Sequence, residues 1–259
     1  MINTREAISI LLFTGLMTIQ TADATTKDTW FVGAGAGQSW LYSLRGSTTV
    51  SNGSNATPPY DQDYFSIKQP SSQTQAQLDI GYQWHENKKF IPSYSTFLRY
   101  RHYFSTQFSG IVDQYSIPEF ENYTYKMRYN ADLLTLNGKI NLVECKSILP
   151  YLSAGIGAVF NHMKDYTETA SANVTSRISP NYSSNTAIAP AVALGIGIDI
   201  HFTPAVWATL GAEYLFQGNI SSGNGSITWS GTHLVFANNA KMSTVFLSIS
   251  ATIPDGFRS

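Results

Sequence analysis

Four segments of the chain alternate strictly between apolar and polar residues. In the segment 74–84, Leu78, Ile80 and Tyr82 occupy every second position, and Gln, Asp or Gly fill the positions between them. The same alternation runs through 151–160, 192–200 and 244–253. Successive side chains of a β-strand point to opposite faces, so each segment predicts a strand that meets a different solvent on each side.

The N-terminal sequence helps to decide whether the apolar faces of these strands point into a protein core or outward at lipid. An apolar run at 7–19 follows Arg5, and Ala22-Asp23-Ala24 is a small-x-small cleavage site, so we predict a signal peptide at 1–24. That run is shorter than the roughly 20 apolar residues of a membrane-spanning helix, and no later segment approaches this length. An exported chain of this kind can reside in a membrane only through strands. We therefore interpret the apolar faces as pointing outward, at lipid.

The polar connections between the apolar segments alternate in length. Long ones fall near 45–72, 105–122, 161–186 and 217–239, and short ones at 85–92, 143–148 and 202–204. Strands that cross a membrane must close on themselves to pair every backbone group, and outer-membrane barrels combine short turns at one end with long loops at the other. We predict a closed antiparallel up-and-down barrel of residues 25–259, all-β, with both termini periplasmic. Its eight strands run near 29–44, 73–84, 93–104, 123–142, 149–160, 187–201, 205–216 and 240–253.

The fourth of these strands changes phase in its middle. Tyr125, Met127 and Leu133 share one face of a strand, whereas Leu134 and Leu136 share the other. A β-bulge near Leu133 and Leu134 would keep both apolar sets on the lipid side. A wrong strand assignment is the alternative.

Aromatic residues gather near the expected strand ends. Trp30, Trp84 and Trp207 lie toward the short turns, and Trp40 and Phe216 lie toward the long loops. We predict that these side chains form two girdles at the membrane interfaces. The alternative is the general preference of aromatic residues for strands.

Composition excludes several classes of function. Charged residues make up 13% of the chain, and the mean hydropathy is -0.11, which fits neither a charged disordered tail nor a helical membrane protein. Removing the signal peptide leaves 15 basic and 15 acidic residues, a balance that gives no reason to expect nucleic acid. Cys145 is the single cysteine, so no intramolecular disulfide can form. The scattered histidines lack metal-ligand spacing, and we expect neither a metal nor a cofactor.

Short motifs carry a family resemblance. They are Pro-Tyr-Leu-Ser-Ala-Gly-Ile-Gly at 150–157, Leu-Gly-Ile-Gly at 194–197, a Thr-Pro turn at 203–204 and Gly-Ala-Glu-Tyr at 211–214. In this order the chain resembles the eight-stranded outer-membrane β-barrels of Gram-negative bacteria, the OmpA-like and OmpW-like domains, over residues 25–253. The chain departs from that pattern by ending Gly-Phe-Arg-Ser rather than on an aromatic residue.

The face opposite the apolar one carries charged residues. In phase, we expect Asp79, Arg99, Arg101, Lys126, Arg128, Asp132, Asp199 and Glu213, with Lys139, to point into the lumen. The interior of an eight-stranded barrel is about wide enough for side chains to fill it, so these charges would pair into a plug. A narrow polar pathway lined by the same charges is the alternative.

Together these features predict a non-enzymatic, monomeric barrel that is surrounded by outer-membrane lipid and lipopolysaccharide. Its expected role is envelope integrity or surface interaction, including adhesion, through loops that meet an extracellular ligand. One alternative is an OmpW-like channel for small solutes. A less favoured alternative is a lipid-modifying enzyme, because His201, Thr203 and Glu213 supply a base, a hydroxyl and an acid.

Overall fold

The structure is a computed structural model of the chain. It describes residues 28–42, 45–49, 62–67, 71–86, 88–177, 180–227, 232–236 and 241–253. The expected signal peptide at 1–24 lies outside the described residues, as do parts of the first and last long loops.

Strands dominate the described residues, with two short 3-10 helices. The strands are β1 (Thr29–Tyr42), β2 (Arg45–Thr49), β3 (Gln62–Ile67), β4 (Ser71–His85), β5 (Phe90–Asp113), β6 (Glu121–Val143), β7 (Ile148–Ala170), β8 (Asn185–Thr203), β9 (Val206–Gln217), β10 (Ile220–Asn224), β11 (His233–Phe236) and β12 (Lys241–Thr252). The helices are η1 (Gln114–Ser116) and η2 (Pro118–Phe120). In this part of the chain, no helix is long and apolar enough to cross a membrane.

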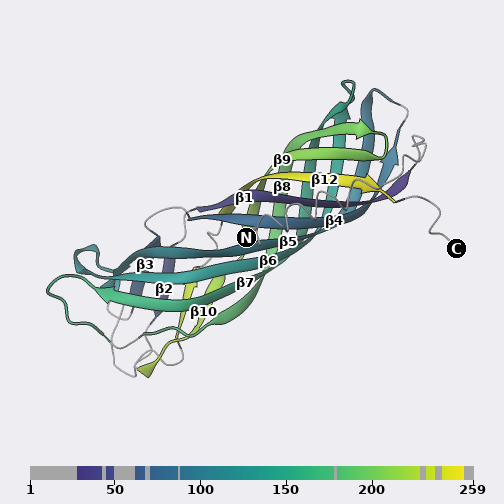
Figure 1. The fold of residues 1–259 in the computed structure, drawn as a ribbon. Helices are drawn as coiled ribbons and strands as arrows, with labels where there is room; N and C mark the ends of the chain where they lie inside the picture. The colour runs from purple at the N-terminus through teal and green to yellow at the C-terminus, as the bar shows by residue number, and fades with distance from the viewer. Residues whose placement is uncertain are drawn as a thin grey trace, which may run out of the picture.

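Eight long strands close into an antiparallel ring. The order around the ring is β1, β4, β5, β6, β7, β8, β9 and β12, and β12 pairs again with β1 in unbroken register from Phe31 opposite Thr252 to Tyr42 opposite Lys241. Sequence neighbours pair with each other around most of the ring, which is up-and-down topology. The eight-stranded closed barrel expected from the sequence is confirmed (Figure 1).

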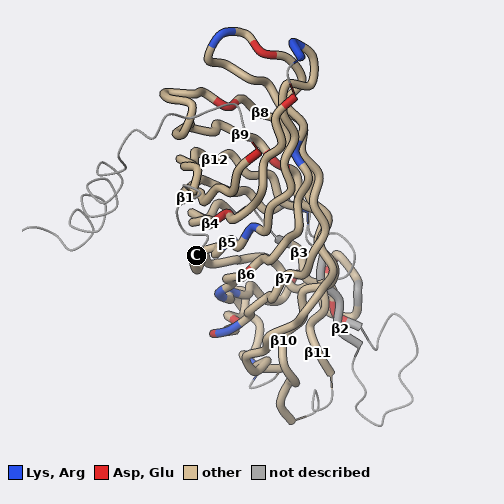
Figure 2. The backbone as a smooth tube through the Cα atoms, turned by 90° about the vertical axis from the view of Figure 1, so that its right-hand side faces the viewer, with Lys and Arg blue, Asp and Glu red and all other residues tan. Residues whose placement is uncertain are grey.

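At the long-loop end, β5, β6 and β7 continue beyond the ring. The far half of β5 pairs with β3, which pairs with β2, and β2 pairs with the β10–β11 hairpin. Backbone hydrogen bonds then join β10 to the segment that precedes β8, including Gly223 N to Ser183 O at 2.9 Å. Figure 1 shows this second wall, called here the extension, at lower left, and Figure 2 shows it from the side below the barrel. The sequence assigned these segments to loops.

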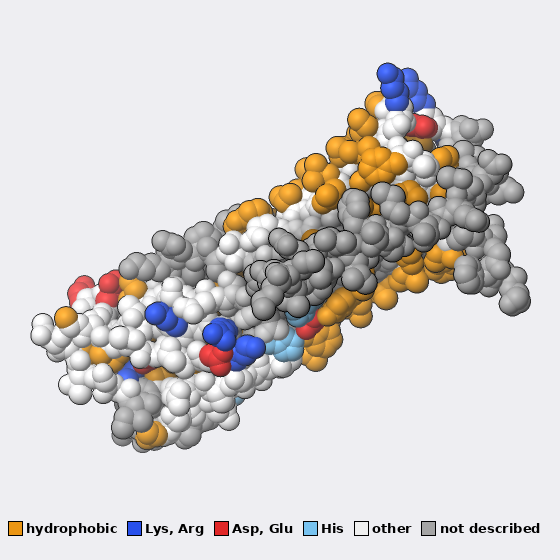
Figure 3. Space-filling view, viewed as in Figure 1, with side chains coloured by type: hydrophobic (Ala, Val, Ile, Leu, Met, Phe, Trp, Pro, Cys, Tyr) orange, Lys and Arg blue, Asp and Glu red, His pale blue; other side chains and the backbone are white. Residues whose placement is uncertain are grey.

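The outside of the barrel carries a belt of exposed aliphatic side chains. It includes Leu78 and Ile80 on β4, Leu136 on β6, and Leu194 and Ile196 on β8, all at least 48% exposed. In Figure 3 the hydrophobic side chains gather over the barrel, whereas much of the surface of the extension is polar. Water would not favour so large an apolar surface, and lipid would. The belt identifies a transmembrane barrel with its apolar faces outward, as the alternation predicts.

The phase change in β6 has a different cause from the one expected. The burial pattern alternates without interruption from Tyr123 to Asn141, and the register with both neighbours is regular at Leu133 and Leu134. The bulge prediction is therefore wrong. Inward positions up to Leu133 are apolar and fill the extension, whereas outward positions from Leu134 onward are apolar and face lipid. One regular strand passes from water into lipid at this point, and its apolar face changes sides there.

Four of the five singled-out aromatic residues lie on the outer surface. Trp30 and Phe216 are exposed, and Trp40 and Trp84 are partly exposed. Trp207 is different: it is 2% exposed and packs against Phe31 with ring centroids 5.5 Å apart. Placing Trp207 in an interfacial girdle was wrong, because it shares the inward phase of Thr209 and Glu213 on β9.

The lipid-facing assignment is tested at Leu194, which is 51% exposed in the belt. Replacing it with Arg should lower the free energy of unfolding from lipid vesicles by about 2 to 4 kcal/mol, because a charge must enter the bilayer. Leu194→Ala is the matched control, and its effect should be much smaller, since it opens no internal cavity. Equal losses for the two variants would contradict the outward assignment.

Candidate functional site

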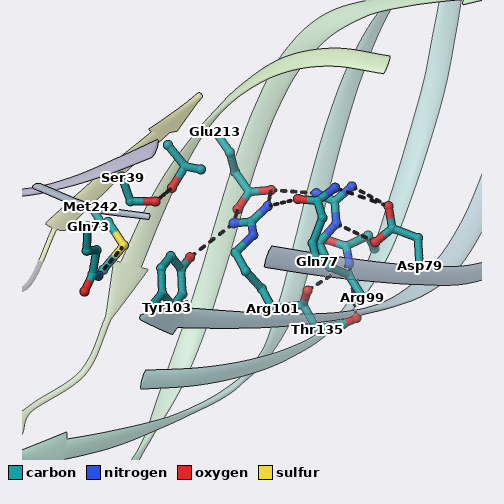
Figure 4. A network of polar contacts seen from close by, with 12 residues as sticks. Ser39, Gln73, Gln77, Asp79, Arg99, Arg101, Tyr103, Thr135, Glu213 and Met242 are labelled. Atoms are coloured by element: carbon teal, nitrogen blue, oxygen red, sulfur yellow. Dashed lines mark hydrogen bonds and ion pairs between the residues drawn. The ribbon is translucent and has the colours of Figure 1, made fainter. Parts of the chain in front are cut away.

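The centre of the barrel holds a buried charge network organised by Glu213 (Figure 4). Arg99 Nη1 donates to Glu213 Oε2 at 3.0 Å, and Arg101 Nη1 donates to Glu213 Oε1. Arg99 also donates two hydrogen bonds to Asp79, from Nε to Oδ1 at 2.8 Å and from Nη2 to Oδ2 at 3.0 Å. One carboxylate from β9 thus joins two guanidinium groups from β5 and, through Arg99, a second carboxylate from β4. Alternate positions on β5 and β4 supply these residues because every second side chain points inward.

A second network lies nearer the short turns. Lys139 Nζ donates to Asp199 Oδ2 at 2.7 Å, and Asn141 donates to the same oxygen at 2.9 Å. Thr209 Oγ1 donates to Asp199 Oδ1 at 2.6 Å. Asp199 is 1% exposed, and its two oxygens therefore have partners from β6 and β9 in place of water. A cavity of about 20 Å³, room for about one water molecule, lies between the two networks and is lined by Asp79, Arg99 and Lys139.

Apolar layers lie above and below the charges. Toward the short turns, Phe31, Phe97 and Trp207 form a small buried cluster. Toward the extension, a larger buried cluster begins at Tyr103 and continues through Tyr129, among other residues of β5 to β9. The charges are consequently enclosed within the described part of the lumen. Buried ion pairs of this kind cost much when one partner is removed, because the other is left charged and dry.

The structure brings together six of the nine expected lumen residues: Asp79, Arg99, Arg101, Lys139, Asp199 and Glu213. The other three, Lys126, Arg128 and Asp132, point outward from β6. Placing these three in the lumen was wrong. The even positions of β6 face outward throughout, and in the extension that outer side meets water, where charged side chains are favoured.

The misplaced Asp132 belongs to a line of polar side chains on the outer surface. It lies at the edge of the belt, where His102 Nδ1 on β5 is 2.7 Å from its Oδ1 and His162 Nε2 on β7 is 3.1 Å from its Oδ2. The hydroxyl of Tyr100 donates to the same carboxylate. On the far side of the His162 ring, Nδ1 is 2.8 Å from Thr186 Oγ1 on β8. Sequence reasoning missed this line because its members come from four separate strands.

A third charged cluster fastens the extension from inside. Arg177 donates to Glu168 through Nε at 2.7 Å and to Asp63 Oδ2 at 2.9 Å. Burial raises the pKa of the Asp63 carboxyl, although the facing Arg177 offsets part of this rise. Burial opposes the charge of Arg177, but Glu168 and Asp63 more than compensate and raise its pKa. The cluster ties the segment after β7 to β3, two regions that the sequence assigned to loops.

The residues considered for a lipid-modifying enzyme do not meet. His201 stacks on Trp207 with centroids 5.5 Å apart, and Thr203 Oγ1 accepts hydrogen bonds from the backbone of the turn at Ala205 and Val206. Glu213 is held by the two arginines. This set cannot act as a base, hydroxyl and acid. Within the described ranges, no group of three or more His, Cys, Asp or Glu side chains is arranged to hold a metal ion.

No protein-family model matches the chain, and no curated protein matches it. Among solved structures, it is similar to Neisserial surface protein A, with 11% identity, a TM-score of 0.45, and coverage of 86% of this chain and 97% of that one. The outer membrane protein OprG of Pseudomonas aeruginosa shows 14% identity, a TM-score of 0.46, and coverage of 86% and 96%. Ail, the attachment invasion locus protein of Yersinia pestis, in complex with the heparin analogue sucrose octasulfate, shows 10% identity, a TM-score of 0.42, and coverage of 88% and 99%.

The pairing geometry predicts unequal effects of neutralising the lumen carboxylates. Glu213→Gln leaves two buried guanidinium groups without their shared partner and should lower stability by about 3 to 5 kcal/mol. Asp79→Asn should cost less, because Arg99 keeps Glu213. Denaturant midpoints in detergent micelles measure both effects.

The control is Glu86→Gln, since Glu86 pairs with the exposed Lys88 at 3.2 Å on the surface. A surface pair of this kind contributes about 0 to 1 kcal/mol. Single-channel conductance of the same variants in planar bilayers separates plug from pathway. Unchanged midpoints with altered conductance for Glu213→Gln would show that the lumen is wet and would overturn the plug.

Proposed function

We propose that the chain is a monomeric outer-membrane barrel whose long-loop end faces the outside of the cell. Lipid, including lipopolysaccharide in the outer leaflet, surrounds the belt. Support comes from the belt of exposed aliphatic side chains and from the segregation of short turns and long loops to opposite ends. In this class of barrel the short turns and both termini lie in the periplasm.

The barrel acts as a closed scaffold and presents a binding surface. The observation that carries this proposal is the enclosed lumen, in which Glu213 and Asp199 are 6% and 1% exposed and apolar clusters lie on both sides. A solute moving along the axis would have to break buried ion pairs and separate a packed aromatic core. A cavity with room for about one water does not replace the hydration of a permeant.

The binding surface lies at the tip of the extension. Tyr64, Tyr115 and Phe120 are each more than 40% exposed there, and the rings of Tyr115 and Phe120 meet edge to face with centroids 6.0 Å apart. Aromatic side chains are enriched at protein interfaces, where they bury a large area with little loss of side-chain freedom. Tyr64 lies on β3, and Tyr115 and Phe120 lie in the short helices η1 and η2 between β5 and β6. The paired strands of the extension flank these helices, so a ligand meets a preformed surface. We propose adhesion to an extracellular ligand as its work.

The single cysteine tests the proposed orientation. Cys145 is exposed in the short turn between β6 and β7. On intact cells, a polyethylene-glycol maleimide too large for porins should leave it unlabelled, and labelling should follow permeabilisation of the outer membrane. A second variant, Cys145→Ser with Asn173→Cys, moves the thiol to the turn after β7 and should label without permeabilisation. The reverse pattern would mean that the barrel is inverted.

The tip is tested by cell adherence. A bacterial host that lacks the chain should adhere more strongly to cultured epithelial cells or matrix-coated surfaces when it expresses the chain. The double variant Tyr115→Ala and Phe120→Ala should lose most of this gain at an equal surface amount, because it removes exposed rings and leaves the barrel intact.

A variant of an exposed aromatic outside the tip, Phe90→Ala at 71% exposure, is the matched control and should keep the adherence. Equal adherence with and without the chain, combined with measurable conductance in planar bilayers, would favour the channel instead.

A further inference from the structure

Four polar side chains form a continuous line across the outer face of β5 to β8. The line runs from His102 through Asp132 and His162 to Thr186, with separations of 2.7, 3.1 and 2.8 Å. It follows the strand register, because His102 pairs directly with Asp132 and His162 pairs directly with Thr186. The side chains of the three titratable members are 27 to 34% exposed, and Thr186 is exposed. A molecule outside the barrel can therefore reach them.

Thr186, His162 and Asp132 are ordered as a nucleophile, a base and an orienting acid. With Nε2 donating to Asp132, His162 Nδ1 is the nitrogen that accepts the Thr186 proton. A hydroxyl within hydrogen-bond reach of an imidazole that a carboxylate holds in place is the arrangement that activates a nucleophile. Tyr100 and His102 fill the remaining sites on Asp132 and fix its carboxylate. With Asp132 held in this way, His162 Nδ1 is the nitrogen that can accept the proton of the Thr186 hydroxyl.

The surroundings of this line vary along the membrane normal. On the belt side lie Leu134 at 42% and Ile188 at 68% exposure, both aimed at lipid. On the extension side, the exposed Lys164 and Arg128 follow on β7 and β6, with Arg128 3.5 Å from the exposed Asp165. Figure 3 shows the pale blue histidines between the hydrophobic belt and a group of basic side chains. An acyl chain packed on the belt would place its ester near Thr186 and an anionic headgroup near the basic residues.

We propose that Thr186, His162 and Asp132 form an ester-hydrolysing site for fatty-acyl esters of phosphate-bearing lipids in the outer leaflet. Thr186 Oγ attacks the ester carbonyl carbon while its proton passes to His162 Nδ1. The bond from that carbon to the alcohol oxygen then breaks, and His162 returns the proton to the departing alcohol. Water, deprotonated by the same imidazole, attacks the acyl-threonine, releases the fatty acid and restores Thr186. Positive charge from Lys164 and Arg128 on the same face favours the anionic headgroup of such a lipid.

This site rests on the proposed membrane placement of the belt, and it is assayed in micelles, where orientation in a cell plays no part. The test uses the full chain folded in detergent and incubated with micelles of anionic phosphatidylglycerol in one arm and lipopolysaccharide in the other, with release of free fatty acid measured by mass spectrometry. The chain should release fatty acid above the lipid-only background in at least one arm, and the arm identifies the source of the ester. Release in neither arm would overturn the site while leaving the orientation test with Cys145 unaffected.

Variants separate chemistry from structure. Thr186→Ala and Asp132→Asn should each lower release at least about a hundred-fold, whereas Thr186→Ser should retain it, because it keeps the hydroxyl. Thr124→Ala, at another exposed threonine of the outer face, is the matched control and should release as the parent does. Heat-dependent gel mobility checks that each variant is folded. An acyl group found on the Thr186 peptide would support the covalent step, and release that survives Thr186→Ala would overturn the role of Thr186.

Discussion

The structure depends on one constraint: each backbone N–H and C=O inside the apolar belt must find a partner without water. A sheet meets this demand only when its first and last strands pair, and β1 and β12 do so in unbroken register. Closure separates an inside from an outside. Every strand then presents alternate residues to two environments, so a two-residue repeat in the sequence becomes a division between lipid and lumen. The buried charges and the exposed belt are two consequences of the same closure.

The two environments exchange places where the strands leave the belt. In the barrel, lipid lies outside and polar side chains fill the inside; in the extension, water lies outside and Tyr125, Tyr129 and Phe65 are buried inside. The strand β6 crosses from one regime to the other with no break in its geometry. The environment of a side chain therefore depends both on its height along the barrel and on the face of the strand to which it points. Asp132, which lies at the crossing, faces outward at a level where a carboxylate can meet both lipid and water.

The fold could be predicted because its signal is local. The immediate neighbours of Leu194 and Ile196 in the sequence indicate which face of the strand these residues occupy. The length of a connection indicates at which end of the barrel it lies. Trp207 shares the phase of Glu213, which the sequence placed in the lumen, so its inward direction could have been predicted. The girdle assignment followed the residue type and its place near a strand end instead of the phase. The extension was missed because Tyr125 and Met127 form the same apolar alternation as a lipid-facing strand. The contacts of Arg101 with Glu213, and of Asp132 with His162, required the register between strands that are distant in sequence, which a single sequence does not contain.

The enclosed lumen also determines where function can reside. Six charged side chains and the apolar clusters around them are committed to holding the ring together, so the interior stabilises the fold and offers a ligand little access. The outer face at the belt edge differs. The side chains of His162 and Asp132 are 30% and 27% exposed there, and their hydrogen-bond partners lie on the same outer face. Chemistry there can be altered without removing a charge from the core. A barrel that is rigid inside can in this way carry reactive side chains at the lipid surface, where strand register alone sets their spacing.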